Sequence, residues 1–359
     1  MATVTDLKKA LRIANLSSLD TGESQVVLQQ RPPCIWYEGI HILAVAALNG
    51  IEVQNLEQPI SINVEDFTSR LVLLDANESI RLALEKKNLV ISTKDKKLSL
   101  RTNFSTPIPK RRGLQNSFEA VIDVGEFTQA VQFLSNITSR KILSFVMTGI
   151  KITLSDRVTL SAVDGYRAAT ISLKSDSITG EVSVVVPAAD LLIAANSMVS
   201  DKAIFRANAN GIEVVDKETK VCLSTLAEGD KFPSLTQLPM KHPVQVVVQD
   251  PSVLGMAAKA SMLIDTSLAI KLASVNQRLL FSVRGQESGE FLCAVSKTVI
   301  PDFEIVLNAE HIRPLQMLQG PIRIALDPTQ RNMVLVTDNR GWKCWIPQMI
   351  PSSTFNVEQ

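Results

Sequence analysis

The chain has 359 residues, of which 45% are hydrophobic and 20% are charged, and its formal net charge is +1. This length is too great for one ordinary hydrophobic core and suits two or three domains. No run approaches the roughly 20 apolar residues of a membrane helix, and the first residues lack the apolar centre of a secretion signal. Because the net charge gives no global attraction to nucleic acid, any contact with DNA must come from a localised face.

The cysteines are few and lie far apart in the sequence, without a Cys-x-x-Cys pair. They are Cys34, Cys222, Cys293 and Cys344. This distribution is typical of reduced thiols within strands, and it predicts a cytoplasmic protein.

The first third of the chain predicts a helix, strands, a second helix and further strands. Leu7, Ala10, Leu11 and Ala14 are spaced as one buried stripe of an amphipathic helix, which we expect over residues 6–16. A second helix is expected over residues 64–74. Alternating or β-branched runs predict strands at 35–37, 43–45, 80–84, 89–93 and 98–101.

The pattern of the first third recurs twice. The spacing of the first helix is repeated at 127–134 and begins again at Leu254. Asp66, Asp190 and His311 occupy equivalent places before an apolar helical stretch, 124 and then 121 residues apart. A regular period of this kind predicts one structural unit repeated three times, each unit burying a similar face.

Proline-rich and glycine-rich segments mark the boundaries between these units. Residues 105–113 and 239–243 carry prolines that fit poorly inside a sheet. The expected fold class is therefore α+β, with three similar domains of two helices each packed on strands. We expect domains at 1–113, 114–241 and 242–350, followed by a polar tail at 351–359.

The most distinctive local run is Leu-Ser-Ala-Val-Asp-Gly-Tyr-Arg-Ala-Ala at 160–169. Taken alone, Asp164-Gly165 predicts a tight turn between strands, with glycine supplying a positive φ. The run also resembles the Thr-Asp-Gly-His-Arg signature in the second domain of the bacterial β sliding clamp, the processivity subunit of DNA polymerase III. Residues 184–187, 228–233 and 344–350 resemble further segments of that family in the same order.

This resemblance implies a DNA clamp fold in which three copies of one domain form half of a ring. Two chains would meet head to tail, encircle duplex DNA without reading its sequence, and confer processivity on a replicative polymerase. Polymerase, clamp loader and repair proteins would bind through short linear peptides. The expected location is the cytoplasm, at the nucleoid and replisome, with no membrane contact.

The resemblance also implies three sets of site residues. The expected partner-peptide pocket comprises Met147, Val163, Gly165, Tyr166, Arg167, Ala168, Pro233, Leu238, Trp345, Ile346, Pro347, Gln348 and Met349. The expected DNA-facing residues are Lys8, Lys9, Arg12, Arg31, Arg140, Lys141, Phe145 and Lys259. The expected dimer interface comprises Leu98, Leu100, Leu263 and Ile264. Each set has a simpler reading, because basic helix faces are often only solvated, and Trp345, Ile346 and the four interface residues could be ordinary core.

Three positions depart from the family pattern in the expected pocket. Tyr166 replaces a histidine, Ala168 a leucine, and Gln348 a flexible methionine that gates the groove. We therefore expect a reshaped pocket with altered peptide preference. The tail at 351–359, which continues past the family's usual end, is expected to lie over the mouth of the pocket.

The sequence offers no catalytic, cofactor or metal site. Its three histidines share no ligand spacing with cysteines or carboxylates, and the common phosphate-binding, nucleophile and metalloprotease motifs are missing from the sequence. We therefore predict an accessory protein rather than an enzyme. One alternative stays open: an oligomeric scaffold or specialised paralogue with the clamp fold that does not encircle DNA.

Overall fold

The computed structural model describes residues 2–13, 25–108, 114, 116–139, 144–176, 178–228, 231–264, 267–285, 289–297, 302–330 and 333–349. The chain forms two compact units. The first comprises Met1–Gln132, Gly149–Val158 and Leu173–Lys231, and the second comprises Phe133–Thr148, Thr159–Ser172 and Phe232–Gln359. Helices and strands are mixed throughout the described residues, which confirms the predicted α+β class. The division into three domains stays a prediction.

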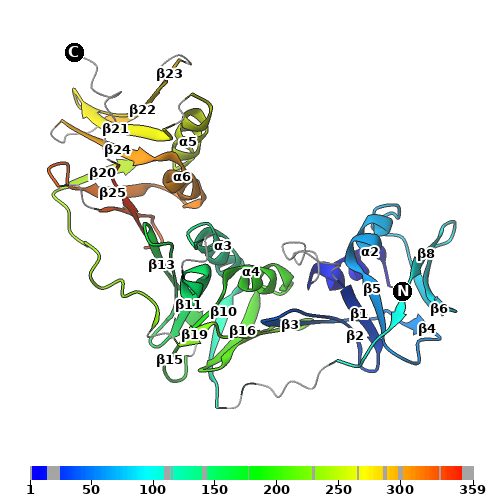
Figure 1. Ribbon diagram of the computed structural model, residues 1–359. Coiled ribbons are helices and arrows are strands. Elements are labelled where there is room, and N and C mark those ends of the chain that lie inside the picture. Colours follow the sequence, from blue (N-terminus) through cyan, green and yellow to red (C-terminus); the bar gives the residue numbers. More distant parts are fainter. Residues whose placement is uncertain are drawn as a thin grey trace. The chain divides into compact units, whose positions relative to one another are not determined.

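The first unit is built on a ten-stranded sheet in the order β14-β10-β16-β17-β18-β3-β2-β1-β5-β9 (Figure 1). Its strands are β1 (Gln25–Gln30), β2 (Pro33–Glu38), β3 (Ile42–Ala47), β5 (Ile60–Asn63), β9 (Asn103–Phe104), β10 (Phe118–Asp123), β14 (Ser175–Asp176), β16 (Lys202–Asn208), β17 (Gly211–Val215) and β18 (Thr219–Ser224). The pairing of β18 with β3 joins strands from the first and second sequence repeats, from Thr219 opposite Ala46 to Leu223 opposite Ile42.

Two smaller sets of strands complete the first unit. One is the sheet β4-β6-β7-β8, with β4 (Val53–Gln54), β6 (Arg81–Glu85), β7 (Asn88–Ser92) and β8 (Lys97–Arg101). The other is the run β19-β15-β11, with β11 (Gly149–Leu154), β15 (Val182–Pro187) and β19 (Ala227–Glu228). All five strands predicted in the first third are present, each within three residues of its expected ends.

Helices cover the ten-stranded sheet of the first unit. They are α1 (Val4–Ala10), η1 (Leu11–Ile13), α2 (Val64–Leu71), α3 (Val124–Ser135, of which Val124–Gln132 belongs to this unit) and α4 (Ala188–Ser197). η1 packs on β2 and β3, α2 on β5, and α4 on β18. The buried stripe predicted for the first helix is confirmed, because Leu7, Ala10 and Leu11 are all buried.

The first helix differs from its expected bounds of 6–16. It begins at Val4 because Thr3 and Asp6 form a capping box, in which Thr3 Oγ1 accepts the Asp6 N–H at 3.3 Å and Asp6 Oδ2 accepts the Thr3 N–H at 2.9 Å. It changes into the 3₁₀ turn η1 after Ala10, and residues 14–16 lie outside the described part. The helix expected over 64–74 ends at Leu71, where i→i+3 bonds tighten the chain.

The second unit contains two antiparallel sheets. One has the order β12-β13-β27-β26-β25-β20, with β12 (Val158–Val163), β13 (Ala168–Leu173), β20 (Val244–Val248), β25 (Ile322–Leu326), β26 (Met333–Thr337) and β27 (Lys343–Pro347). The other has the order β23-β22-β21-β24, with β21 (Ala269–Val275), β22 (Arg278–Arg284), β23 (Glu290–Lys297) and β24 (Phe303–Asn308). β13 pairs with β27 from Ala168 opposite Trp345 to Thr170 opposite Lys343.

Helical segments of the second unit are η3 (Phe145–Thr148), α5 (Ser252–Ile264), α6 (Ala309–Ile312) and η5 (Arg313–Met317). α5 packs against β22 and against α6 and η5, beside the four-stranded sheet (Figure 1). Near the end of α3, Phe133 packs against Trp342 with ring centroids 6.0 Å apart. Within the described residues, no helix combines the length and the hydrophobicity needed to cross a membrane.

Candidate functional site: a cavity beside the Asp-Gly-Tyr-Arg turn

The Asp-Gly-Tyr-Arg run forms a tight turn between β12 and β13. Asp164 Oδ1 accepts the N–H groups of Tyr166 and Arg167, at 2.9 and 2.6 Å, and Gly165 takes a φ of +92°. This positive φ is the reason why the turn needs glycine at that position. The turn leaves Tyr166 70% exposed, so its ring is presented at the surface of the second unit.

An ion pair holds Arg167 across this turn. Arg167 Nε donates to Asp164 Oδ2 at 2.7 Å, and both side chains are nearly buried. Arg167 Nη1 also donates to the backbone oxygen of Glu310 at 3.3 Å. The arginine therefore connects the turn to α6 and is held in one position.

His311, on α6, lies beside the exposed tyrosine. The two rings are stacked with centroids 6.4 Å apart and planes inclined by 26°. Burial and then the positive charge of Arg167 lower the pKa of His311 below 6.5, although Asp164 and Glu310 act in the opposite direction. The imidazole is therefore mainly neutral at pH 7, and its Nδ1 is buried without a hydrogen-bond partner among the described residues.

These residues border a cavity of about 490 Å³ within the second unit. Its size falls within the range of roughly 300–1,000 Å³ of small-ligand pockets. It is lined by Asn136, Thr138, Ser139, Asp164, Tyr166, Arg167, Met262, Glu310, His311, Arg313, Pro314, Gln316 and Met317. The end of α3 meets η5 at this cavity, where Asn136 Nδ2 approaches Met317 Sδ at 3.8 Å.

Only Tyr166 and Arg167 of the predicted pocket residues line this cavity. Val163, Ala168, Trp345 and Ile346 are buried, and Trp345 Nε1 donates to the Pro239 oxygen at 2.9 Å. The half-buried members are Met147, Pro233, Leu238, Pro347, Gln348 and Met349, and Gly165 is exposed. The simpler reading of Trp345 and Ile346 as residues of a terminal core strand agrees with their burial.

Gln348, which stands where the family has a gating methionine, is tied to a neighbouring loop. Its Nε2 donates to the backbone oxygens of Asp327 and Gln330, at 3.2 and 3.4 Å. Met349, after which the described chain ends, donates its N–H to the Val306 oxygen at 2.7 Å. The tail at 351–359 and its expected place over the pocket lie outside the described residues.

The predicted DNA-facing residues are on helices and turns. Lys9 and Arg12 are exposed on α1 and η1, Lys8 is half-buried, Arg31 is exposed in the turn before β2, and Lys259 is exposed on α5. Phe145 is 67% exposed in η3. Arg140 and Lys141 lie outside the described residues.

The four predicted interface residues differ in exposure. Leu263 is 83% exposed at the end of α5, and its neighbour Ile264 is half-buried. On β8, Leu98 is half-buried while Leu100 is buried, at 1% exposure. Leu100 therefore belongs to the core of its sheet, whereas Leu263 is available to a partner.

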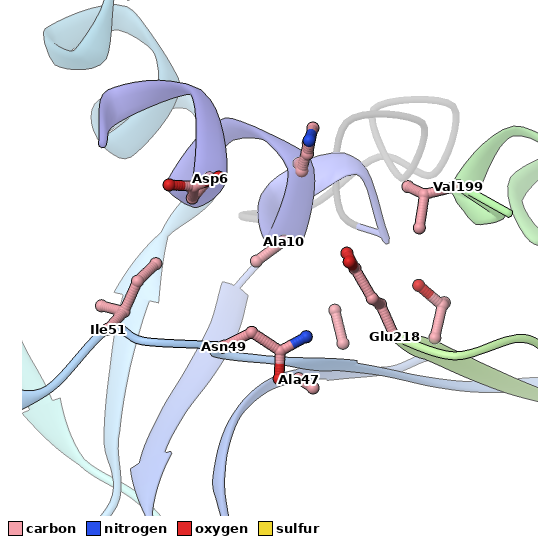
Figure 2. Close-up of a pocket in the computed structure, with 10 residues that line it drawn as sticks. Asp6, Ala10, Ala47, Asn49, Ile51, Val199 and Glu218 are labelled. Atoms are coloured by element: carbon pink, nitrogen blue, oxygen red, sulfur yellow. The ribbon is translucent and has the colours of Figure 1, made fainter. Parts of the chain in front are cut away.

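A second, much smaller cavity of about 40 Å³ lies in the first unit (Figure 2). Asp6 and Ala10 reach it from α1, Asn49 from the segment after β3, and Val199 and Glu218 from loops around α4 and β18 (Figure 2). This volume holds only a few water molecules. We assign it no ligand.

Sequence reasoning missed most of the cavity lining. His311 occupies, in the third repeat, the position that Asp66 and Asp190 occupy in the first two. Nothing in that pattern marks it as a site residue. Met262, Arg313 and Met317 look like ordinary helix-surface residues. Among the described residues, no group of three or more histidines, cysteines or carboxylates is placed to hold a metal ion.

Comparisons with known proteins identify the fold through structure rather than sequence. No family model and no curated protein matches the chain. The DNA polymerase III β subunit of Thermotoga maritima is similar at 15% identity and a TM-score of 0.82, covering 98% of this chain and 99% of that one. The β subunit of Pseudomonas aeruginosa is similar at 18% identity and a TM-score of 0.75, covering 96% and 98%.

A third solved structure is the Pseudomonas aeruginosa sliding clamp bound to griselimycin. It is 15% identical, with a TM-score of 0.77, and covers 97% of this chain and 98% of that one. All three similarities extend over nearly the whole length of both compared chains. The chain therefore has the DNA clamp fold of the bacterial DNA polymerase III β subunits.

Proposed function

We propose that this protein is a DNA sliding clamp, a non-catalytic accessory subunit that closes around duplex DNA and tethers a polymerase to it. The observation that carries this proposal is the similarity in fold to β subunits over 96–98% of the chain. Each of these matches also covers 98–99% of the solved structure.

The edges of two sheets support a head-to-tail dimer. β8 is the outer strand of its sheet in the first unit, and β23 is the outer strand of its sheet in the second. Large apolar side chains are exposed near both: Val72 and Leu73 follow α2, which contacts β8, while Leu263 and Leu292 lie on α5 and β23. Edge strands flanked by exposed apolar groups favour pairing with another chain.

The exposed basic side chains of α1, η1 and α5 support contact with DNA phosphates. Lys9, Arg12 and Lys259 would make weak, salt-screened contacts that do not prevent sliding. The proposed partners are a polymerase, a clamp loader and repair proteins, each contributing a short peptide that docks on the second unit near Tyr166 and Arg167. The proposed location is the nucleoid.

Retention on circular DNA tests this proposal. The protein is incubated with nicked circular plasmid, with and without a bacterial clamp loader and ATP, and then passed through a sizing column in high salt. We expect it to elute with the circular plasmid and to be lost when the same complexes are linearised by a restriction enzyme. A stable dimer that never co-elutes with circular DNA in either arm, or that is retained equally after linearisation, would instead support the clamp-fold scaffold.

A further inference from the structure

A cavity of about 770 Å³ lies in the first unit, beside the place where β4 and β6 begin to pair. The two strands run parallel, from Val53 opposite Leu82 to Gln54 opposite Ala83. Residues 50–52, which precede β4, and the start of β6 both contribute to the lining of the cavity. Its size falls within the range of roughly 300–1,000 Å³ of small-ligand pockets.

Two basic side chains of the lining form no ion pair with any described residue. Arg81 is exposed at the start of β6, and Lys94 is exposed in the turn after β7. Ser92, which is opposite Arg81 in the pairing of β6 with β7, contributes a hydroxyl group to the lining. Guanidinium, ammonium and hydroxyl groups are donors that bind phosphate oxygens in proteins.

Thr93 adds a second hydroxyl group to the lining, and its oxygen already serves as an acceptor. Thr93 Oγ1 accepts the Lys96 N–H at 3.1 Å, and the Thr93 N–H donates to the Lys96 oxygen at 2.9 Å. These two bonds hold the turn that carries Lys94. A hydroxyl group that accepts one bond can still donate another, so the Thr93 O–H can donate to an anion.

Buried apolar side chains form another part of the lining. Ile51, Ile80 and Leu82 are 5%, 8% and 1% exposed. They offer an apolar surface to the body of a ligand, and a free phosphate ion has no apolar group to place there. The cavity is therefore suited to a phosphate that is attached to a larger group.

The acidic and amide side chains of the lining restrict the charge of the ligand. Glu52 and Gln54 are exposed and line the cavity. Glu78 also lines it, but its carboxylate is engaged by Lys96 Nζ at 3.9 Å and by the Asp75 N–H at 3.3 Å. The carboxylate of Glu52 would repel a polyanion such as DNA. Glu52 and Gln54 can instead accept hydrogen bonds from the hydroxyl and amino groups of a nucleoside.

We propose that this cavity binds a nucleoside monophosphate. Its phosphate contacts Arg81 and Lys94, while its sugar and base contact Glu52 and the apolar part of the lining. All the lining residues belong to the first unit. The proposal therefore goes beyond the proposed clamp function and does not depend on it.

Calorimetric titration of the full-length chain at low ionic strength tests the proposal. The probe is AMP, and its two parts, adenosine and inorganic phosphate, are titrated directly and as competitors of AMP. We expect AMP to bind with a Kd below about 1 mM. Adenosine lacks the charged group and phosphate lacks the apolar group, so each should bind at least about tenfold more weakly than AMP.

The two ends of the four-stranded sheet provide matched variants. Arg81→Gln combined with Lys94→Gln removes both basic side chains from the cavity. Arg101→Gln combined with Lys87→Gln removes the same two kinds of charge at the opposite end of the sheet. All four positions are exposed, so both double variants should fold.

We expect the double variant at the cavity to weaken AMP binding at least about tenfold, because it loses charge-assisted hydrogen bonds to the phosphate. The double variant at the other end should change it by less than about twofold. If the first variant does not fold, Lys94→Gln alone is compared with Lys87→Gln, and only the former should weaken binding.

Equal weakening by the two double variants would overturn the proposal, because it would show a general attraction of the basic sheet for anions. Failure of the native chain to bind AMP below about 1 mM would also overturn it. So would adenosine or inorganic phosphate binding as tightly as AMP, since recognition would then need only one part of the nucleotide. None of these outcomes affects the clamp proposal, which the linearisation assay tests separately.

Discussion

Glu213 is a buried carboxylate on the strand β17, and it forms ion pairs with two charged neighbours. Its side chain is 3% exposed and lies 2.9 Å from Arg206 Nη1 and 2.6 Å from Lys220 Nζ. Arg206 also contacts Glu119 at 2.7 Å. Burial raises the pKa of Glu213, but the hydrogen bonds and charges of Lys220 and Arg206 outweigh it, so the pKa lies below 4.5.

Removing this carboxylate should destabilise the first unit. We expect Glu213→Ala to lower the free energy of unfolding in urea by about 2–3 kcal/mol at pH 7, since it removes the buried acceptor that Arg206 and Lys220 share. Because the folded-state pKa is lowered, the contribution is present above about pH 4.5 and is lost as the pH falls through the folded-state value. The difference between native protein and variant should therefore shrink in acid.

Glu119→Ala is the matched control, because Glu119 contacts the same arginine but its side chain is 45% exposed. It should cost less than about 1 kcal/mol. Equal losses from the two variants would contradict the importance of burial in this network.

At the scale of single residues, the sequence identified the Asp164-Gly165 turn and its conformation but not the environment of Trp345. The turn depends on local hydrogen bonds of Asp164, which the residue types predict. The burial of Trp345 depends on Pro239, which is 106 residues away along the chain. No local pattern records such a contact.

Among the elements, the exposed end of α5 is the most informative test of association. Leu263 is 83% exposed, so Leu263→Asp should change the unfolding free energy by less than about 0.5 kcal/mol. If the residue lies in the dimer interface, however, a desolvated carboxylate would weaken the dimer by at least about tenfold in Kd. Sedimentation equilibrium should show a shift from twice 39.3 kDa toward 39.3 kDa.

Ile40→Asp provides the comparison, because Ile40 is 87% exposed in the turn between β2 and β3 and belongs to none of the predicted sites. It should leave the mass of the native protein unchanged. If the native chain is dimeric and Leu263→Asp has the same mass, the end of α5 does not lie in the dimer interface.

The elements themselves were largely predictable, because their ends are coded locally. Asn63 and Asn308 cap α2 and α6 by accepting the N–H groups of Asp66 and Glu310, at 3.0 and 2.8 Å. These asparagines occupy equivalent places in the first and third repeats, whereas Pro187 in the second makes no side-chain cap. The cavity was not predictable, because α3 and η5 meet there from positions such as Asn136 and Met317, which lie 181 residues apart.

For the whole molecule, a closed ring would stay on circular DNA even if its direct contacts with the DNA were weak. Retention and affinity should therefore respond differently to the loss of basic residues. The triple change Lys8→Ala, Lys9→Ala and Arg12→Ala should reduce the salt dependence of binding to a short linear duplex by roughly two to three in log–log slope. Retention on circular plasmid should change little, since a closed ring needs no tight contact. Anisotropy of a labelled duplex across a salt series measures the first effect, and the sizing column measures the second.

Three other exposed lysines of the first unit, Lys87, Lys94 and Lys217, give a variant with the same loss of charge. Its slope should remain close to that of the native protein. Equal slopes for the two triple variants would show that α1 and η1 do not face DNA.

The joint between β3 and β18 has a consequence for how the chain tolerates a break. Five residue pairs, from Thr219 with Ala46 to Leu223 with Ile42, bind the first sequence repeat to the second within one continuous sheet. Ile108 is tied to the same sheet through its N–H, which donates to Gln29 Oε1 at 2.9 Å. If the backbone is cut between Ile108 and Leu114, the two resulting polypeptides should therefore stay assembled. Hydrogen bonds between strands, and not the covalent chain, hold the two repeats together here.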